Sequence, residues 1–322
     1  MTSVRVGLIG YGLGGAVFHA PYIAATPGLS LTAIVTGNPE RRAQAEREHP
    51  AAAVLGSTSE LWARAADLEL IVVATSNRTH VPLALAAMEA GLAVVVDKPL
   101  APTAAEARTL VEAALERGTL LTVFHNRRWD GDFLTVRELV ESGQLGTVSR
   151  FESRYERWRP EVAAGWRNDP DPAEGGGILI DLGSHVVDQA LQLFGRPQEV
   201  YGEVRCVRPG AQTDDDAFVA LVHESGTVSH LWMSAVAAQP GPRFRVLGDR
   251  AAYVYGAPAE FEEAPGFLGA GDDIRTIPTP PNTWVRFYED VAASLQEGAP
   301  PPVDPADAVA TLEVLEAARG LE

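Results

Sequence analysis

The 26 basic side chains comprise 25 arginines and a single lysine, Lys98. Arginine stays charged at any accessible pH, whereas lysine carries a compact ammonium group that can release a proton when its pKa is lowered. Lys98 directly follows an apolar run and lies in the segment Val96-Asp97-Lys98-Pro99. A biased composition could leave one lysine by chance, so its context decides. Because it follows a strand-like run, we expect Lys98 at the carboxyl edge of a sheet, where ligands of doubly wound folds bind.

A second group of chemically capable side chains stands at helical spacing in the other half of the chain. Asp181, His185 and Asp188 lie at i, i+4 and i+7, so a helix would place all three on one face. Three interpretations are open: a metal site, a helix N-terminus satisfied by Asp181, or an acid/base pair in which Asp181 orients His185. We favour the acid/base pair because of Lys98 and a nearby cofactor motif, and we expect no metal.

The cofactor motif is a glycine-rich turn after the first strand-like run. It reads Gly10-Tyr11-Gly12-Leu13-Gly14-Gly15 and contains the spacing GxGxxG. The first glycine permits a tight turn, the second lets the backbone approach a pyrophosphate, and the third lets helix and strand pack closely. Because it opens an alternating strand and helix pattern, we predict that Gly10, Gly12, Leu13, Gly14 and Gly15 bind a dinucleotide.

The residues after the second strand indicate which dinucleotide is bound. An NAD enzyme usually carries Asp or Glu there to hold the ribose 2′-hydroxyl. This chain has Thr36 and Gly37 in that position, followed by Arg41 and Arg42, whose guanidinium groups could bind a 2′-phosphate. We therefore favour NADP(H) over NAD(H), although Glu40 keeps the NAD interpretation open.

The elements that must position these residues differ between the two halves. The first part alternates apolar strand-like runs with helix-like segments. Strands are predicted at residues 4–9, 31–35, 70–74, 92–96 and 120–124, and helices at 41–48, 82–90 and 103–117. This alternation predicts a Rossmann-type α/β domain, a doubly wound parallel sheet with helices on both faces.

The second part contains runs of adjacent strands. Helices are expected at 133–142, 178–194, 285–296 and 305–319, and strands at 148–157, 199–208, 216–223, 227–235 and 243–247. The Gly- and Pro-rich residues 256–282 are expected to form a mobile loop. The pattern predicts an α+β domain with a large, mostly antiparallel open sheet, used for substrate binding and oligomerisation. We place the boundary so that residues 1–123 form the dinucleotide-binding domain and 124–322 the second domain, with the final helix packing back near the first.

Composition excludes several classes of protein. The chain has 322 residues, a formal net charge of −17 and one cysteine, so there can be no internal disulfide or thiolate metal cage. Its acidic balance argues against nucleic-acid and anionic-membrane partners. No apolar run approaches the ~18 residues of a membrane span, and the strand-like N-terminus leaves no room for a signal peptide. We expect a cytoplasmic protein.

Several other polar and aromatic residues have simpler structural explanations. We expect His19 to pack in the first helix, and Trp158 and Trp232 to lie in the core or at a subunit interface. Residues 214–216, three consecutive aspartates, lack the spaced ligands of a calcium loop and are expected to form a solvated turn.

Four segments together resemble the Gfo/Idh/MocA family of oxidoreductases, over nearly the whole chain. They read GLIGYGLGG, VATSNRTHVPLALAAMEAGLAVVVDKPL, FHNRRWD and GGGILIDLGSHVVDQALQLFG. Within the family, the segments HAPYIAATPGL and HNRRWD and the DKP form are most similar to bacterial NADP-linked scyllo-inositol 2-dehydrogenases.

The resemblance implies roles for individual residues. It assigns catalysis to Lys98, Asp181 and His185, and further cofactor contacts to Thr75, Asn77, His80, Lys98, Asn126, Trp166 and Arg167. Two positions depart from the family pattern. Ser76 replaces the usual proline and Asp97 the usual glutamate, and neither change removes a catalytic group.

The expected activity is reversible oxidation of a secondary alcohol of a cyclic polyol or sugar, with NADP⁺ as acceptor. Arg127 and Tyr155 join Lys98, Asp181 and His185 as predicted substrate-binding residues. Alternatives are an NAD-assisted glycoside hydrolase or aldose oxidoreductase of the same fold, and a nonenzymatic sensor of NADP and sugar. Because an exposed sheet face must be covered, we also expect a homodimer or homotetramer.

Overall fold

The computed structural model describes residues 3–162, 165–256 and 264–321, which fold into two compact units. Unit 1 comprises Met1–Asn126 and Trp284–Val309, and unit 2 comprises Arg127–Thr283 and Ala310–Glu322. The predicted boundary at residue 123 assigned all of 284–309 to the second domain, whereas the structure places this segment in unit 1.

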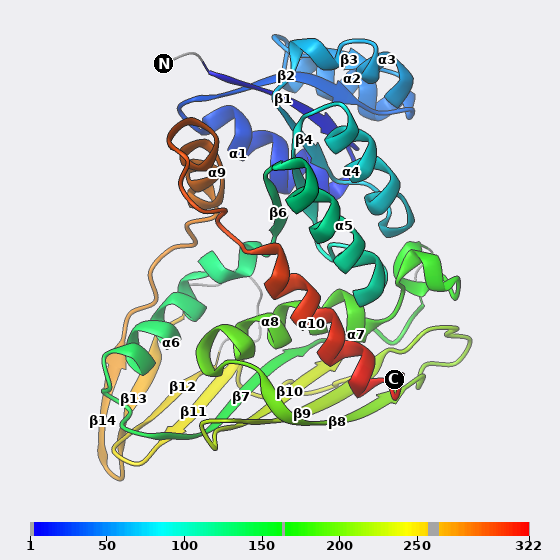
Figure 1. The fold of residues 1–322 in the computed structure, drawn as a ribbon. Helices are drawn as coiled ribbons and strands as arrows, with labels where there is room; N and C mark the ends of the chain where they lie inside the picture. The colour runs from blue at the N-terminus through cyan, green and yellow to red at the C-terminus, as the bar shows by residue number, and fades with distance from the viewer. Residues whose placement is uncertain (1–2, 163–164, 257–263, 322) are drawn as a thin grey trace. The chain divides into compact units, whose positions relative to one another are not determined.

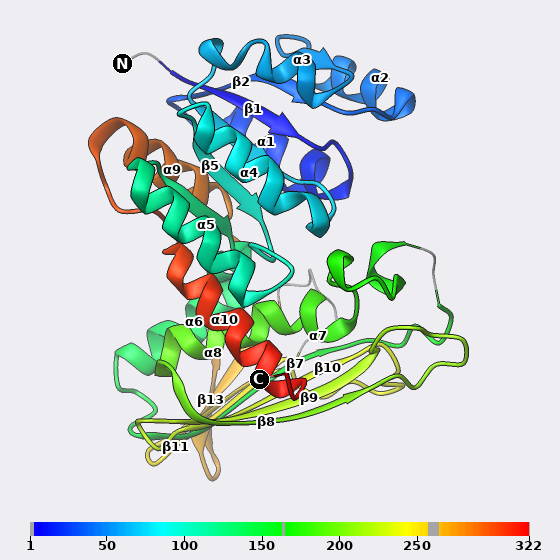
Figure 2. The ribbon, with the colours of Figure 1, turned by 45° about the vertical axis from the view of Figure 1, so that its right-hand side comes forward.

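Unit 1 is built on a six-stranded parallel sheet with the order β3-β2-β1-β4-β5-β6. Its strands are β1 Val4–Ile9, β2 Leu29–Val35, β3 Ala53–Leu55, β4 Leu70–Val73, β5 Ala93–Asp97 and β6 Leu121–Phe124. Its helices are the π-helix η1 Gly14–His19, α1 Ala20–Ala25, α2 Pro39–Glu48, α3 Thr58–Trp62, α4 His80–Glu89, α5 Ala104–Arg117 and α9 Val285–Glu297, with short turns η2 Ala65–Asp67 and η3 Asn77–Thr79. Figures 1 and 2 show α1 and α9 on one face of this sheet and α4 and α5 on the other.

The helices on both faces explain why the central strands read as continuous apolar runs. Every residue of β4 and of β6 is buried, as expected for a parallel sheet covered on two sides. Helix α5 begins as its sequence predicts: the Thr103 hydroxyl accepts from the Glu106 backbone N–H at 3.2 Å and donates to the Glu106 carboxylate at 2.9 Å. The strand order reverses between β1 and β4, which directs ligands to the carboxyl ends of these strands.

Unit 2 is built on an eight-stranded mixed sheet with the order β14-β13-β12-β11-β7-β10-β9-β8. The strands are β7 Val148–Glu156, β8 Pro197–Arg205, β9 Asp216–His223, β10 Val228–Ser234, β11 Phe244–Gly248, β12 Ala252–Tyr255, β13 Gly266–Ala270 and β14 Asp273–Ile277. Only the pair β7 and β10 is parallel among the described strand pairs of this sheet. The predicted fold class, a Rossmann sheet plus a mostly antiparallel sheet, is therefore confirmed.

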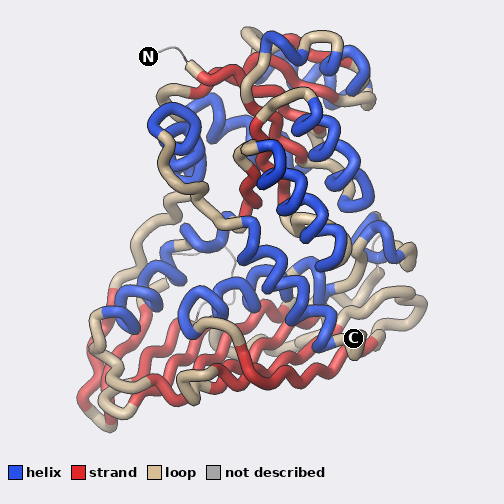
Figure 3. Tube along the Cα trace, viewed as in Figure 1, coloured by secondary structure: helices blue, strands red, loops and turns tan. Residues whose placement is uncertain are grey.

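The helices of unit 2 gather on one face of its sheet. They are α6 Gly131–Glu141, α7 Ile178–Asp181 and α8 Gly183–Phe194, with turns η4 Asn126–Trp129, η5 Trp166–Asn168 and η6 Pro172–Glu174. The last helix, α10 Pro305–Ala318, ends against β8, since a side chain on Gly202 would overlap the Ala318 backbone. Figure 3 shows helices α6, α7 and α8 on one side of the strands and no described helix on the other.

Alternation along the strands matches this one-sided covering. Along β9 and β10, the buried residues Val219, Leu221, Leu231 and Met233 face the helices, while the residues between them are only half-buried. None of the described helices combines the length and apolar character that crossing a bilayer requires.

Three local expectations were wrong. The helix predicted over 178–194 breaks at Leu182 into α7 and α8. Described parts of the supposed loop 256–282 form the hairpin β13–β14, while residues 257–263 lie outside the described residues. The aspartates at 214–216 all have partners, among them Arg319 for Asp214 and Arg205 for Asp216. Asp215 is buried and accepts from Arg208 at 2.9 Å, so this segment is not a solvated turn.

Candidate active site

The glycine-rich turn of unit 1 is shaped by backbone crowding. Gly10 has φ +101°, and a side chain there would overlap the carbonyl of Ala74. A side chain on Gly15 would overlap the carbonyl oxygen of Gly10. Both positions therefore require glycine, the first for the turn and the other for the close approach of η1 to β1.

Gly12 differs from its neighbours because the position that a side chain would occupy is open and faces an arginine. A Cβ on Gly12 would lie 3.5 Å from a terminal nitrogen of Arg41. Arg42 extends over Gly56, and within the described part of the chain neither guanidinium is paired with a carboxylate. Leu13 beside them is 66% exposed. The guanidinium of Arg41 thus places a positive charge beside this turn, where a phosphate of a dinucleotide could bind.

The end of β2 carries the residues on which the expected cofactor preference rests. Thr36 is buried, and its backbone N–H donates to Leu55 O at 3.0 Å. Gly37 is exposed, and the Asn38 side chain caps α2 by accepting from the N–H groups of Glu40 and Arg41, both at 3.0 Å. The cap fixes the first turn of α2, which carries both arginines.

The segment after β4 is a compact turn held by its own side chains. The hydroxyls of Thr75 and Thr79 lie 2.6 Å apart, and Asn77 is buried. His80 is also buried, with Nδ1 2.8 Å from Pro99 O and Nε2 3.2 Å from Thr75 O. Burial lowers the pKa of His80, against the opposing effect of Asp97. This turn and the loop after β5 are therefore linked through one imidazole.

Lys98 lies where its sequence context predicts, directly after β5. Its backbone N–H donates to Asp97 Oδ1 at 2.8 Å. After β6, the buried Asn126 begins the turn η4. The carboxyl ends of β1, β4, β5 and β6 thus bring together Gly10, Thr75, Lys98 and Asn126 along one edge of the sheet of unit 1.

In unit 2, Asp181 and His185 are both buried, on consecutive helices. Asp181 Oδ2 accepts from Arg167 Nε at 2.7 Å, and the His185 ring stands edge-on to Tyr155 with a centroid separation of 6.3 Å. Trp166 begins the same turn as Arg167, but its side chain lies outside what the structure describes.

The start of α7 is stabilised by Asp214, which the sequence analysis expected only in a solvated turn. The backbone carbonyl of Asp214 accepts from the N–H of Ile178 at 2.8 Å. Its carboxylate accepts from the N–H of Leu179, also at 2.8 Å. Gly177 has φ +101°, and a side chain there would overlap this carboxylate. Asp214 therefore takes the helix-start role that was one interpretation of Asp181.

Asp188, the third member of the predicted face, forms a buried ion pair instead of joining the acid/base group. Arg128 reaches its two carboxylate oxygens at 2.9 and 2.5 Å. Such bidentate geometry offsets the desolvation of both charges, and removing either partner would leave a buried charge. Sequence spacing alone could not reveal this pair, because its members are 60 residues apart.

Tyr155 lies between two arginines. The guanidinium carbons of Arg127 and Arg243 lie 4.8 and 4.0 Å from the centre of its ring. Arg127 also pairs with Asp130 at 3.0 Å, and Arg243 donates to Gln189 at 2.9 Å. Burial raises the pKa of Tyr155, although both arginines oppose the shift. The tyrosine therefore stays neutral beside His185.

A third arginine adds to this cationic cluster. Burial and the nearby Arg159 lower the pKa of Arg157 to about 10, while Asp181 acts in the opposite direction. Neither Arg157 nor Arg243 carried a recognisable motif. The only signal for either residue in the sequence was that it is an arginine in a strand-like segment that faces the helices. The structure thus surrounds Asp181, His185 and Tyr155 with positive charge.

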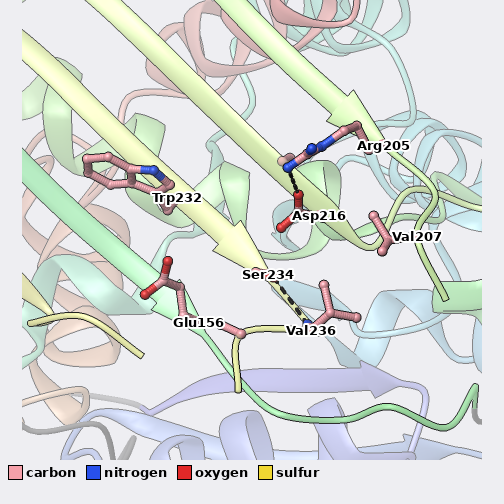
Figure 4. A pocket seen from close by; sticks show the side chains of 9 residues that line it. Glu156, Arg205, Val207, Asp216, Trp232, Ser234 and Val236 are labelled. Carbon is pink, nitrogen blue, oxygen red and sulfur yellow. Dashed lines mark hydrogen bonds and ion pairs between the residues drawn. The ribbon is translucent and has the colours of Figure 1, made fainter. Parts of the chain in front are cut away.

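One pocket, of about 280 Å³, opens on the helix-free face of the unit 2 sheet (Figure 4). Its lining includes Trp232, Glu156 and the ion pair of Arg205 with Asp216 at 2.5 Å. None of the predicted catalytic residues lines it. Across residues that the structure describes, no group of three or more His, Cys, Asp and Glu side chains is arranged to hold a metal ion.

Comparisons with known proteins agree with both units. Residues 4–125 match the oxidoreductase family with an NAD-binding Rossmann fold, and residues 133–254 match the GFO/IDH/MocA C-terminal domain. The chain belongs to the Gfo/Idh/MocA family. The resemblance of its motifs to this family is therefore confirmed, and the protein is an NAD(P)-dependent dehydrogenase acting on CH–OH groups.

Individual members of the Gfo/Idh/MocA family match over nearly the whole chain. The scyllo-inositol 2-dehydrogenase (NADP(+)) IolW of Bacillus subtilis is 34% identical, covering 99% of this chain and 93% of the relative. The uncharacterized oxidoreductase YdgJ of Escherichia coli is 37% identical, covering 98% and 95%. The solved structure of the oxidoreductase yvaA from Bacillus subtilis superposes with a TM-score of 0.90, at 33% identity, covering 99% and 96% of the two chains.

The contrast between Gly12 and Gly15 gives a testable prediction. Gly12→Ala adds only an ordinary contact, so its melting temperature should match the parent while dinucleotide affinity falls about tenfold, near 1.4 kcal/mol. Gly15→Ala forces overlap with backbone and should cost about 2 kcal/mol of stability or more. Thermal unfolding and calorimetric titration with NADP(H) measure both quantities. Equal destabilisation by the two substitutions would contradict this interpretation.

Proposed function

We propose that the protein reversibly oxidises a secondary alcohol of a cyclic polyol or sugar to a ketone, with NADP⁺ preferred over NAD⁺. The supporting observation is the lone lysine at the carboxyl end of β5 together with a buried Asp181 and His185. These residue types occur in a chain similar to an enzyme named for scyllo-inositol and NADP⁺. An inositol-like ring is therefore the first substrate class to test.

The residues of unit 1 would hold the cofactor. The glycine turn leaves its backbone accessible at Gly12, and Arg41 and Arg42 would bind the 2′-phosphate. Thr75, Asn77, His80 and Asn126 would contact the nicotinamide half. Trp166 and Arg167 of unit 2 complete the proposed set. Bound NADP⁺ supplies the acceptor for the two electrons that leave the alcohol carbon.

Each catalytic residue has a separate task in this proposal. His185 takes the proton of the reacting hydroxyl as general base, since a neutral imidazole accepts a proton readily near neutral pH. Lys98 stabilises the developing alkoxide with its compact positive charge. Asp181, anchored by Arg167 at 2.7 Å, holds the substrate or the imidazole in orientation.

Arg127 and Tyr155 would bind the remaining hydroxyl groups of the polyol. Arginine donates several hydrogen bonds in a fixed plane, which suits a ring with many hydroxyl oxygens. Tyr155 is held against two guanidinium groups and can present its edge beside His185. This neutral, hydroxyl-rich substrate class matches a site in which the arginines already have partners such as Asp130.

We also propose that the open face of the unit 2 sheet joins two copies of the chain. Neighbouring strands carry a row of stacked side chains there: Tyr201 contacts Phe218 with centroids 6.4 Å apart, Phe218 contacts Trp232 at 5.1 Å, and Arg154 lies 3.8 Å from the Trp232 ring. Tyr201 is 57% exposed. Aromatic and arginine side chains are enriched at the centres of subunit interfaces.

The cofactor preference is tested at Arg41 and Arg42. Replacing both by alanine should weaken NADP(H) binding by a few kcal/mol at most and leave NAD(H) almost unchanged, because only the 2′-phosphate is lost as a partner. Arg47→Ala, on an exposed arginine at the other end of α2, is the matched control. Fluorescence titration measures both affinities, and equal losses for the two cofactors would contradict the preference.

The role of Lys98 is tested by substitution with the residue used at every other basic position. Lys98→Arg and Lys98→Met should each lose roughly 10²-fold or more in kcat for inositols, with little change in NADP(H) affinity. His185→Ala should lose a similar amount, and the double variant far less than the product. Near-parental turnover by Lys98→Arg would overturn the mechanism, and cofactor binding without turnover of any polyol would favour a sensor.

The proposed interface is tested by a charge in the aromatic row. Tyr201→Asp should shift a dimer or tetramer toward monomer in sedimentation, because the interface would have to bury an unpaired carboxylate. Leu115→Asp is the matched control, since Leu115 is 77% exposed on α5 of unit 1. A parent chain that sediments as a monomer at micromolar concentration would rule out the interface.

A further inference from the structure

The carboxylate of Asp97 connects the loop of Lys98 to a buried polar group that the proposed mechanism does not use. Its Oδ1 accepts from the Lys98 backbone N–H at 2.8 Å. Its Oδ2 lies against the glycine turn, so that a Cβ on Gly14 would approach it to 2.9 Å. The same oxygen lies 3.5 Å from Nε2 of His19, whose side chain is fully buried.

The proton positions on His19 follow from its two partners. A carboxylate can only accept, so a favourable contact with Asp97 calls for a hydrogen on Nε2 of His19. The other nitrogen, Nδ1, lies 2.5 Å from the hydroxyl of Tyr288, which can donate or accept. At 3.5 Å the contact with Asp97 is longer than a standard hydrogen bond, so its strength is mainly electrostatic.

Tyr288 is held rigidly on the far side of His19. Its ring packs against Phe124 and Phe287, with centroid separations of 5.9 and 5.2 Å. Burial, followed by the charge of Asp97, raises the pKa of Tyr288 well above its usual value. The phenol therefore stays neutral and fixes the orientation of the imidazole. This contact joins α9 to η1 across 269 positions of the chain.

The charge state of Asp97 depends on these neighbours. Burial has the largest single effect and acts to raise its pKa, but the effects of His19, Lys98 and His80 together exceed it and lower the pKa. An ionised Asp97 gives the Lys98 N–H a charge-assisted hydrogen bond, which is stronger than a bond between neutral groups. On the other side of Lys98, His80 lies 2.8 Å from the carbonyl of Pro99.

We propose that His19 and Tyr288 are positioning residues for the dehydrogenase reaction, acting through the Asp97 carboxylate to fix the backbone of Lys98. This inference rests on the proposed function, because it assigns them a role in catalysis only through Lys98. A backbone displaced by even 1 Å would move the ammonium group away from the reacting oxygen, and displacements of that size can cost up to 10²-fold in rate.

The single lysine of the chain permits a direct experiment. Protein labelled only with ¹⁵N-lysine has one backbone amide resonance, that of Lys98, and its shift reports the hydrogen bond to Asp97 without any need for activity. Two variants separate the contacts of His19. His19→Gln places an amide nitrogen near the Nε2 position and keeps a donor to Asp97, whereas His19→Asn places one near Nδ1 and keeps only the contact with Tyr288.

The expected results distinguish positioning from general stability. His19→Gln should keep the parental amide shift and the parental pH dependence of that shift, with kcat within a few-fold. His19→Asn should shift the amide resonance and make it titrate toward neutral pH, because only Lys98 and His80 then oppose the rise that burial causes in the pKa of Asp97. The kcat of His19→Asn should fall about tenfold with KM little changed, and the acid limb of its pH–rate profile should move to higher pH. Tyr288→Phe should change the amide shift, kcat and the acid limb in the same direction as His19→Asn, by a smaller amount.

Two outcomes would overturn the inference. One is a parental amide shift and pH profile in a folded His19→Asn variant. The other is an equal loss of kcat in His19→Gln and His19→Asn that follows an equal loss of melting temperature, which would indicate a purely structural role. Failure of the proposed function is recognised separately: the parent chain would then turn over no polyol, while the amide measurements on the His19 variants would still report on the contact with Asp97.

Discussion

The close approach of the first helical turn to β1 is the constraint on which the architecture of unit 1 depends. Gly15 packs on the carbonyl of Gly10, so η1 begins almost in contact with the strand. Only then can the carboxylate that ends β5 lie against Gly14 and face His19. A dinucleotide turn is usually explained by what it offers to a phosphate. Here the same absence of side chains also lets three neighbouring segments share the half-buried carboxylate of Asp97.

Unit 2 meets a different constraint, since it buries several arginines among polar groups. Arg128 is matched by Asp188, and Arg243 by Gln189 together with the face of Tyr155. Because a buried charge without a partner is strongly destabilising, each guanidinium determines where its neighbours must lie. The helix face that carries His185 is therefore rigid for electrostatic reasons as well as through apolar packing. Such rigidity suits a general base, whose efficiency depends on its geometry.

Sequence patterns predicted the fold well where periodicity or a motif was strong. The buried strands, the Thr103 cap and the alternation of β9 and β10 all follow from local sequence. The edge strand β3 was missed because its three residues are too few to show a period. The hairpin β13–β14 was missed because Gly and Pro outweighed its short apolar runs. At the site, the spacing predicted that Asp188 lies on the same helix face as His185. It did not predict the pairing of Asp188 with Arg128, because partners distant in sequence leave no local signal. His19 was expected only to pack, since nothing in the sequence brings Tyr288 or Asp97 beside it.

The membership of α9 in unit 1 has a consequence for the order of folding. The first 126 residues contain all six strands of their sheet, yet the ring that orients His19 arrives from residue 288. During synthesis this sheet must therefore wait for most of unit 2 to emerge before its core is complete. Closing so long a loop is costly in entropy, although that cost grows only slowly with length. Until then Phe124 at the end of β6 lacks its contacts with Phe287 and Tyr288, and it leaves a surface that a chaperone or a premature partner could bind.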